Sequence, residues 1–253
     1  MSSDSEAEWP RLLRHAAHEL RTPLGVGLGY LGFILSSSDG PLTARQRQFV
    51  AESQKALGRI RTIADEMSEL ARLEAGEVTL RTEPVDIGKV LAEAVAALPP
   101  VEDRRVTVNV ATSGQPGVFE GDSTRLRTAF TSILFGLRRE LVTSPTLFVR
   151  ETQRLLDGRP ASWIAIGDAD QIDRLAAAGP DTLKSFEEWR GGCGLNLAIA
   201  RRILEAHGGQ VWSPGDGVKA GAAIALPPVR RGGPQRPPDG GRLGKESSQP
   251  AAT

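Results

Sequence analysis

The chain has 253 residues, enough for one or two domains with their own hydrophobic cores. Its 31 basic and 31 acidic side chains cancel, so no bulk charge points to nucleic acid or an anionic membrane as a partner. The only cysteine, Cys193, excludes an internal disulfide framework, and the longest uncharged apolar stretch, residues 24–35, is too short to span a bilayer. We therefore expect a cytoplasmic protein that is not inserted in a membrane.

The N-terminal third carries the pattern of two helices. Apolar side chains recur every three or four residues over 13–34 and again over 49–73, which marks one face of a helix in each segment. Turn-forming residues separate the two segments, and Gly76 follows the second. We predict a disordered N-terminus at residues 1–8 and an antiparallel helical hairpin over residues 9–76. The hairpin has one apolar stripe and little to bury it against, so we expect a homodimer that forms a four-helix bundle.

The remainder of the chain mixes helices with strands. Helical periodicity and strand-like alternation follow each other along the chain. The order is helix 86–98, strand 105–110, helix 122–137, strands 146–152 and 162–168, a glycine-rich turn followed by an amphipathic helix within 191–209, and strand 221–227. These elements predict an α/β sandwich over residues 84–228, so the fold class is α+β. Residues 229–253 are rich in glycine, proline and arginine with almost no apolar side chains, and we expect a disordered tail there.

A literal G-x-G-x-x-G occurs in the first helical segment, at Gly27, Gly29 and Gly32. A dinucleotide-binding fingerprint needs a strand before its glycines and a helix that opens at them. Here the glycines lie inside a continuing helical pattern with no strand in front. We therefore do not interpret this run as a phosphate-binding loop.

A polar strip of the first helix contains His18, nearly opposite Leu20 on the helical wheel. Pro23 lacks an N–H, so it leaves the Glu19 carbonyl without its usual helical partner and is expected to bend the helix. Neutral imidazole is a good nucleophile near neutral pH, and a carboxylate at Glu19 can orient or deprotonate it. These residues fit either a nucleophilic histidine, with Thr22 one turn on, or a solvated surface histidine.

The motif HELRTPL, residues 18–24, resembles the phosphoacceptor box of two-component sensor histidine kinases. Weaker resemblances to later boxes of that family follow in the family's order: GDSTRLRTAFTSILFG at 121–136, IAIGDAD at 164–170, FEEW at 186–189 and GCGLNLAIARRILEAHGG at 192–209. The resemblance covers about residues 10–228. It implies a dimerisation and histidine-phosphotransfer domain, followed by an ATP-binding domain of the histidine-kinase (Bergerat) fold.

The resemblance also implies a role for each residue of the phosphoacceptor box. His18 would accept a phosphoryl group on a ring nitrogen, and Glu19 would be its acid–base partner. Thr22 would position a water that removes phosphate from an aspartate of the partner. The implied partner is the receiver domain of a response regulator, with an upstream sensor or partner kinase as a further candidate.

In the ATP-binding domain the resemblance implies ATP and Mg²⁺ as cofactors. Asp168 would accept a hydrogen bond from the adenine amino group, and Gly192 and Gly194 would let backbone amides approach phosphates at a helix N-terminus. However, Gly136 stands where the family has its metal-binding asparagine, and Asn196 replaces the third glycine of the last box. Glycine has no oxygen ligand for Mg²⁺, so we assign no metal ligand and expect a degenerate nucleotide site.

The leading hypothesis is a two-component signal transduction protein of the sensor histidine kinase type. His18 exchanges its phosphoryl group with a response-regulator aspartate, and is charged either from ATP by the degenerate domain or through partner aspartates alone. The alternative is a pseudokinase that acts as a histidine phosphotransferase or phosphatase, or as a non-catalytic dimeric adaptor controlling a partner kinase or regulator.

Overall fold

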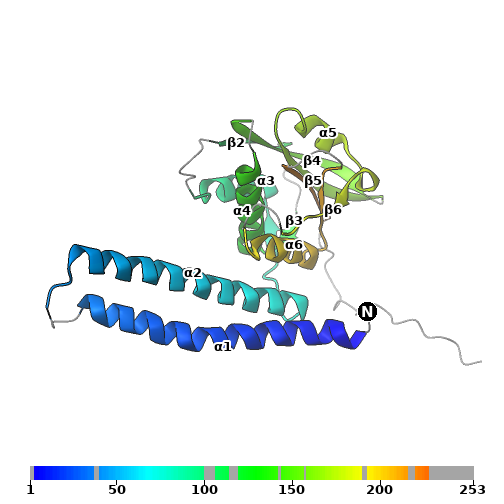
Figure 1. The fold of residues 1–253 in the computed structure, drawn as a ribbon. Helices are drawn as coiled ribbons and strands as arrows, with labels where there is room; N and C mark the ends of the chain where they lie inside the picture. Colours follow the sequence, from blue (N-terminus) through cyan, green and yellow to red (C-terminus); the bar gives the residue numbers. More distant parts are fainter. Residues whose placement is uncertain are drawn as a thin grey trace, which may run out of the picture.

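A computed structural model describes the chain at residues 3–36, 40–99, 106–113, 119–141, 144–156, 158–189, 193–215 and 220–227. Two long helices, α1 (Ser3–Ser36) and α2 (Ala44–Glu74), form an antiparallel hairpin, and an α/β domain lies beside the C-terminal half of α2 (Figure 1). The predicted α+β fold class is confirmed. The tail predicted at residues 229–253 lies outside the described residues.

The first helix begins earlier than the sequence suggests. It starts at Ser3, whereas we expected disorder through residue 8. The sequence at this start, SDSEAE, is rich in acidic residue types, which are favoured at helix N-termini because of the helix dipole. This preference explains a helical start before the apolar pattern begins. Pro23 lies inside the helix and does not end it.

Local signals define both ends of α2. The Thr43 hydroxyl accepts the Gln46 N–H at 3.2 Å, and the Gln46 side chain accepts the Thr43 N–H at 2.9 Å, which is a capping box. At the other end Gly76 has a φ of 65°, a left-handed conformation that glycine adopts without strain. The hairpin therefore has the ends that its turn residues predict.

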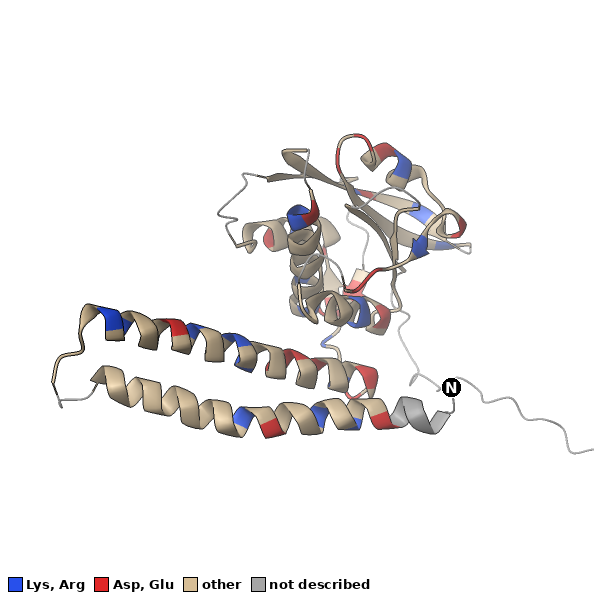
Figure 2. Ribbon diagram, in the orientation of Figure 1, with Lys and Arg blue, Asp and Glu red and all other residues tan. Residues whose placement is uncertain are grey.

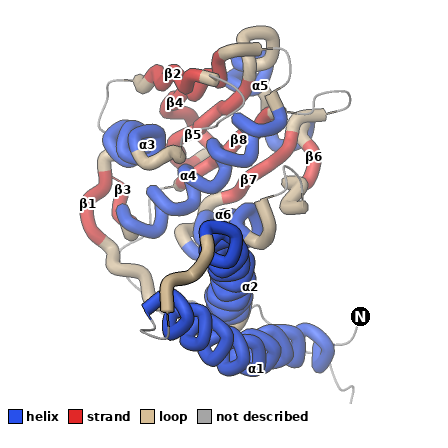
Figure 3. The backbone as a smooth tube through the Cα atoms, turned by 60° about the vertical axis from the view of Figure 1, so that its left-hand side comes forward, coloured by secondary structure: helices blue, strands red, loops and turns tan. Residues whose placement is uncertain are grey.

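The α/β domain is built on a six-stranded sheet. Its strand order is β2 (Thr107–Ala111), β4 (Thr146–Leu156), β5 (Arg159–Gly167), β8 (Gly221–Leu226), β7 (Gln210–Ser213) and β6 (Lys184–Ser185). All neighbours are antiparallel except β2 and β4. One face is covered by α3 (Ile87–Ala96), α4 (Ser123–Glu140) and α6 (Asn196–Ala206), as Figure 3 shows.

Burial on both faces explains why β5 is central. Ile164 and Ile166 belong to the main core with α4 and α6. On the opposite face, Ala165 packs against Leu175 of the short helix α5 (Ile172–Ala177), and Trp163 stacks on Trp212 at 5.5 Å. The sequence indicated the long elements of this domain. It missed the short ones: α5, the 3₁₀ turn Pro180–Thr182, β6, β7 and the two-stranded sheet of β1 (Glu83–Val85) and β3 (Phe119–Gly121).

A buried histidine joins the end of α6 to the start of α4. His207 is 1% exposed, and its Nε2 accepts the backbone N–H of Asp122 at 3.0 Å. Its Nδ1 lies 2.7 Å from the Ile203 carbonyl oxygen, which is an acceptor only, so Nδ1 carries the proton. Burial lowers the pKa of His207, against smaller opposing effects of the Ile203 carbonyl and the Asp122 charge. The ring is therefore neutral in the folded protein.

Asp122 is the second member of this junction. Its carboxylate accepts the N–H of Arg125, which caps α4, and the N–H of Arg81 in the linker from the hairpin, at 3.0 and 3.1 Å. Burial by itself would raise the pKa of Asp122, but these N–H groups and the Arg125 charge lower it below its usual value. The start of α4, the end of α6 and the linker are thus fastened together.

We predict that His207 makes stability depend on pH. Below its ordinary pKa of 6.5 the unfolded chain binds a proton that the folded chain excludes, so the free energy of unfolding falls as the pH drops from 7.5 to 5.5. The variant His207→Leu leaves the buried Asp122 N–H without an acceptor and should lose about 1–3 kcal/mol at pH 7.5. Urea unfolding at both pH values should show this gap shrinking at pH 5.5. A gap that is constant with pH, or that appears equally in His15→Leu on the exposed face of α1, would contradict the role of His207.

Candidate phosphoacceptor and nucleotide-like sites

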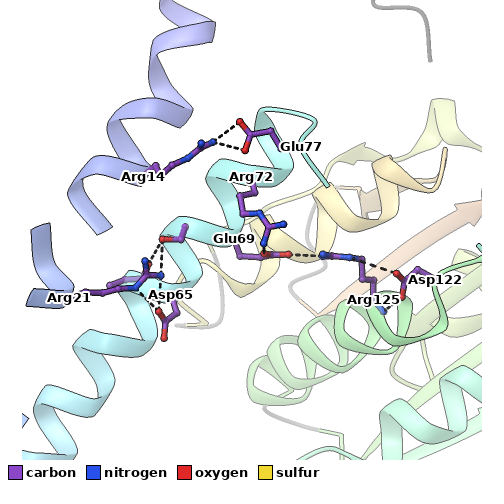
Figure 4. Close-up of polar contacts among 10 residues, drawn as sticks. Arg14, Arg21, Asp65, Glu69, Arg72, Glu77, Asp122 and Arg125 are labelled. Atoms are coloured by element: carbon purple, nitrogen blue, oxygen red, sulfur yellow. Dashed lines mark hydrogen bonds and ion pairs between the residues drawn. The ribbon is translucent and has the colours of Figure 1, made fainter. Parts of the chain in front are cut away.

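His18 projects from α1 into solvent. Its side chain is 74% exposed, as the polar strip of the sequence predicts. Two ion pairs on either side of it tie α1 to the end of the hairpin: Arg14 with Glu77 at 2.9 Å and Arg21 with Asp65 at 2.8 Å (Figure 4). The imidazole is therefore accessible while its helix is held on both sides.

A carboxylate faces one nitrogen of this ring. The Glu19 Oε1 lies 3.7 Å from His18 Nδ1, and both side chains are largely exposed. Thr22 is also exposed and follows His18 by four residues, which places it on the same face of the helix. The arrangement leaves Nε2 of His18 open to a reacting group, with an acid–base group at Nδ1.

The hairpin beyond His18 carries an uncovered apolar surface. Residues 22–36 of α1 contain no charged side chain, which is visible as the long tan stretch in Figure 2. Large exposed apolar side chains on the two helices include Leu20, Val26, Tyr30, Phe33, Ile34, Phe49, Ile60 and Ile63. The predicted apolar face of α2 is thus exposed in the single chain from Phe49 to Ile63, whereas Leu70 further along is buried. Many large apolar side chains exposed on the same two helices are typical of a protein–protein interface.

Asp168, the predicted adenine ligand, lies directly after β5. Its Oδ1 accepts the Gln171 N–H at 3.0 Å, and its carbonyl accepts the Ile172 N–H at the same distance. The side chain therefore holds the turn that leads into α5. One carboxylate oxygen is committed to this turn, so the local structure accounts for an aspartate here without a nucleotide.

Gly136, which stands in place of a metal-binding asparagine, is buried between α4 and α6. A Cβ atom added at this position would lie 3.3 Å from both Cys193 Sγ and a methyl carbon of Leu197, closer than most side-chain contacts. The two helices approach so closely here that glycine fits best. Among the described residues no group of three His, Cys, Asp or Glu side chains could hold a metal ion.

The N-terminus of α6 is contacted by a carboxylate from the hairpin. Glu66 of α2 accepts the Asn196 side-chain N–H at 2.8 Å and the Leu195 backbone N–H at 3.4 Å. Gly194 has a φ of 61° and lies beside the same carboxylate. Gly192, the other glycine predicted to approach phosphates, lies outside the described residues. Gly136 offers no metal ligand, Asp168 holds a turn and Glu66 occupies the N-terminus of α6, so the residues described in this region do not fit ATP with Mg²⁺.

Sequence reasoning missed the carboxylates of α2. Glu69 contacts Arg125 at 2.6 Å, and Arg125 in turn lies 3.9 Å from Asp122 (Figure 4). Glu74 contacts Arg202 of α6 at 2.6 Å. The sequence gives no signal for these pairs beyond a helix rich in acidic residues, because their partners lie far along the chain.

Comparisons with known proteins show which proteins this chain resembles. Residues 10–76 match the His Kinase A (phospho-acceptor) domain. The chain is 25% identical over 201 residues to the circadian input-output histidine kinase CikA of Synechococcus elongatus, a match that covers 77% of this chain and 26% of that protein. It is 29% identical over 214 residues to the probable sensor histidine kinase TcrY of Mycobacterium tuberculosis, covering 79% and 42%. The chain is therefore similar to sensor histidine kinases over most of its length, and its hairpin matches their phospho-acceptor domain.

A solved structure has a fold similar to that of this chain. A crystal structure of full-length ShkA in complex with AMPPNP matches with a TM-score of 0.62 and 24% identity, over 87% of this chain and 45% of that one. The chain spans about a quarter of the length of CikA and of GacS from Pseudomonas syringae, at 26% and 25%. None of the helices in the described part of the chain has the length and apolar character needed to cross a membrane.

We predict that restoring asparagine at position 136 damages the protein instead of rebuilding a metal site. Gly136→Asn forces a polar side chain against Cys193 and Leu197, and should cost about 1–3 kcal/mol of stability, with no gain in Mg²⁺-dependent ATP binding. Ser132→Asn, one turn earlier at a half-buried position, is the control and should unfold close to wild type. Urea unfolding and calorimetric titration with ATP measure both effects. A Gly136→Asn protein as stable as wild type would show that α4 and α6 have room for a ligand there.

Proposed function

We propose that this chain is a two-component signalling protein of the histidine kinase type, in which His18 carries a phosphoryl group and exchanges it with an aspartate of a response-regulator receiver domain. The observation that supports it most is the exposure of His18 beside Glu19, inside the segment that matches the phospho-acceptor domain. An upstream sensor or partner kinase supplies the input. The sequence has a single cysteine, Cys193, which agrees with a reducing compartment, and we place the exchange in the cytoplasm.

The exchange is a displacement at phosphorus. The lone pair of His18 Nε2 attacks the phosphorus of the aspartyl phosphate, an N–P bond forms, and the P–O bond to aspartate breaks with its electron pair returning to the carboxylate. The Glu19 carboxylate faces Nδ1 and is placed to take the proton that this nitrogen carries. The reverse reaction returns the phosphoryl group to aspartate, with Glu19 giving the proton back.

Thr22 serves hydrolysis of the same partner phosphate. Its hydroxyl follows His18 by one turn on the exposed face of α1, where it can orient a water toward an aspartyl phosphate docked at His18. The water then attacks phosphorus and releases inorganic phosphate, and the aspartate carboxylate is regenerated. Transfer and hydrolysis therefore use one docking position for the receiver domain.

The exposed apolar faces of both hairpin helices support a homodimer. In a four-helix bundle the outward face of α2, which includes Ile60 and Ile63, would be buried against the partner's hairpin. His18 lies on the polar strip of α1, so pairing of the apolar faces leaves it exposed. No step of this mechanism is assigned to ATP, because those residues of the nucleotide-like site that the structure describes do not fit it.

We predict that a phosphorylated receiver domain transfers its phosphoryl group to His18. Purified protein is mixed with a cognate receiver domain charged with radiolabelled phosphate, and label on the chain is followed on gels, with its position mapped by mass spectrometry at alkaline pH. Wild type should acquire acid-labile label at His18, while His18→Gln should acquire less than about 1% of it because the nucleophile is absent. His15→Gln, at an exposed histidine one turn earlier, is the matched control and should behave as wild type. Equal labelling of all three proteins, or none on wild type, would contradict the proposal.

We also predict that a charge on the outward face of α2 separates the dimer. Ile63 is 44% exposed in the single chain, and Ile63→Asp would bury a carboxylate at the bundle interface. Analytical ultracentrifugation should give a dimer for wild type and a monomer for this variant. Leu155→Asp, at a side chain 72% exposed on β4 of the other domain, should remain dimeric. A wild-type monomer, or a dimer that survives Ile63→Asp, would be the contrary result.

A further inference from the structure

The N-terminus of α6 is an anion-binding position within the α/β domain. Helix N-termini carry unpaired N–H groups and the positive end of the helix dipole, so they bind carboxylates and phosphates. The α6 helix has 11 residues, and no side chain of its own caps its N-terminus. Resemblance to histidine kinases places nucleotide phosphates at this helix. The N-terminus of α6 is therefore suited to one anion. A nucleotide phosphate bound there would make the domain an ATP-binding domain, whereas a carboxylate of the chain would block that binding.

In this structure the anion comes from the chain itself. The Glu66 carboxylate accepts hydrogen bonds from the side-chain amide of Asn196 and the backbone N–H of Leu195, at 2.8 and 3.4 Å. A side chain on Gly194 would come within 3.3 Å of the same carboxylate. The neighbouring Asp65 points toward α1 instead and pairs with Arg21 at 2.8 Å. Asp65 and Glu66, which are consecutive in α2, thus connect α2 to α1 and to α6, respectively.

Asn196 is the residue that strengthens this contact. Its side chain supplies the shorter of the two hydrogen bonds to Glu66, and it also donates to the Cys193 carbonyl at 3.2 Å. A glycine at this position, as in the resembling motif, would have no donor to offer beyond its backbone. Asn196, which departs from the glycine-rich pattern, is therefore the residue that hydrogen-bonds the Glu66 carboxylate of the hairpin.

Further contacts along the same side of α2 keep Glu66 in place. Leu70, one turn on, is 5% exposed and belongs to the core shared with the α/β domain. Glu69 pairs with Arg125 of α4, and Glu74 pairs with Arg202 of α6, both at 2.6 Å. Because apolar burial and two more ion pairs fix the same three turns, the carboxylate of Glu66 is positioned at α6 before any ligand arrives.

We propose that Glu66 is an internal anion that takes the place of a nucleotide phosphate at α6, so that the ATP-like site is closed and serves as the joint between hairpin and α/β domain. A phosphate group at the same N-terminus would have to displace this carboxylate, because two anions repel each other and compete for the same N–H groups. The proposal concerns nucleotide binding and not the modification of His18. It therefore stands or fails independently of phosphotransfer to that residue.

The test is the affinity for ATP, measured by calorimetric titration of the full chain with and without Mg²⁺. Glu66→Gln removes the charge and keeps the shape, and should bind ATP at least about 10-fold more tightly than wild type, the range expected when a charged competitor for hydrogen bonds is removed. Asp65→Asn removes the adjacent charge, which does not reach α6, and should bind as wild type does. Glu66→Gln that binds ATP within about twofold of wild type, or Asp65→Asn that gains as much, would overturn the proposal.

A second variant removes the other partner of the Glu66–Asn196 hydrogen bond. Asn196→Ala leaves the hairpin untouched and removes the 2.8 Å hydrogen bond, so it should also raise ATP affinity, by a smaller factor. If both changes act on one contact, the double variant should gain less than the product of the two single gains. Full multiplicativity, or no gain in Asn196→Ala, would contradict a shared contact. Should Glu66→Gln unfold, as judged by circular dichroism, the Asn196→Ala titration alone decides the question by the same criterion.

Discussion

Packing of the last turns of α2 against the α/β domain is the constraint on which the rest of the arrangement depends. Leu70 joins the main core, so the hairpin and the domain share one hydrophobic interior. On either side of this apolar strip, Glu66, Glu69 and Glu74 each find a partner on α4 or α6. Burial of the strip supplies most of the stabilisation, because partly exposed ion pairs contribute little by themselves. The carboxylates instead set the register between the two parts.

This packing divides the hairpin into two regions with different surroundings. The end of α2 is covered by the domain, whereas large apolar side chains such as Tyr30 and Phe33 on α1, and Ile60 and Ile63 on the outward face of α2, remain exposed. His18 lies between the two regions, on a face that neither the domain nor the proposed dimer contact covers. An exposed imidazole next to an apolar scaffold suits the proposed exchange with a separate receiver domain, which must approach the ring directly.

The fold expected of a nucleotide-binding domain is present here, while the residues at its predicted nucleotide positions make contacts within the chain. Gly136 is packed between helices, Asp168 holds a turn, and the α6 N-terminus is bonded to Glu66. The sheet and its three covering helices are stabilised by apolar burial, to which a ligand site contributes little, so the site can change while the fold does not. The same helix N-terminus that binds an anion can then be used for joining two domains.

The sequence by itself determined the elements whose signals are local: the hairpin from its helical periodicity, the ends of α2 from Thr43 and Gly76, the long strand pair from its alternation, and the exposure of His18 from the polar strip around it. Only the tertiary structure decided what Glu66 and its neighbours contact. Asn196 is 130 residues away along the chain, and no periodicity or capping pattern encodes which faces of two distant helices will meet. Short elements such as α5 were not predicted for a similar reason: they form by packing against the sheet and not by local propensity.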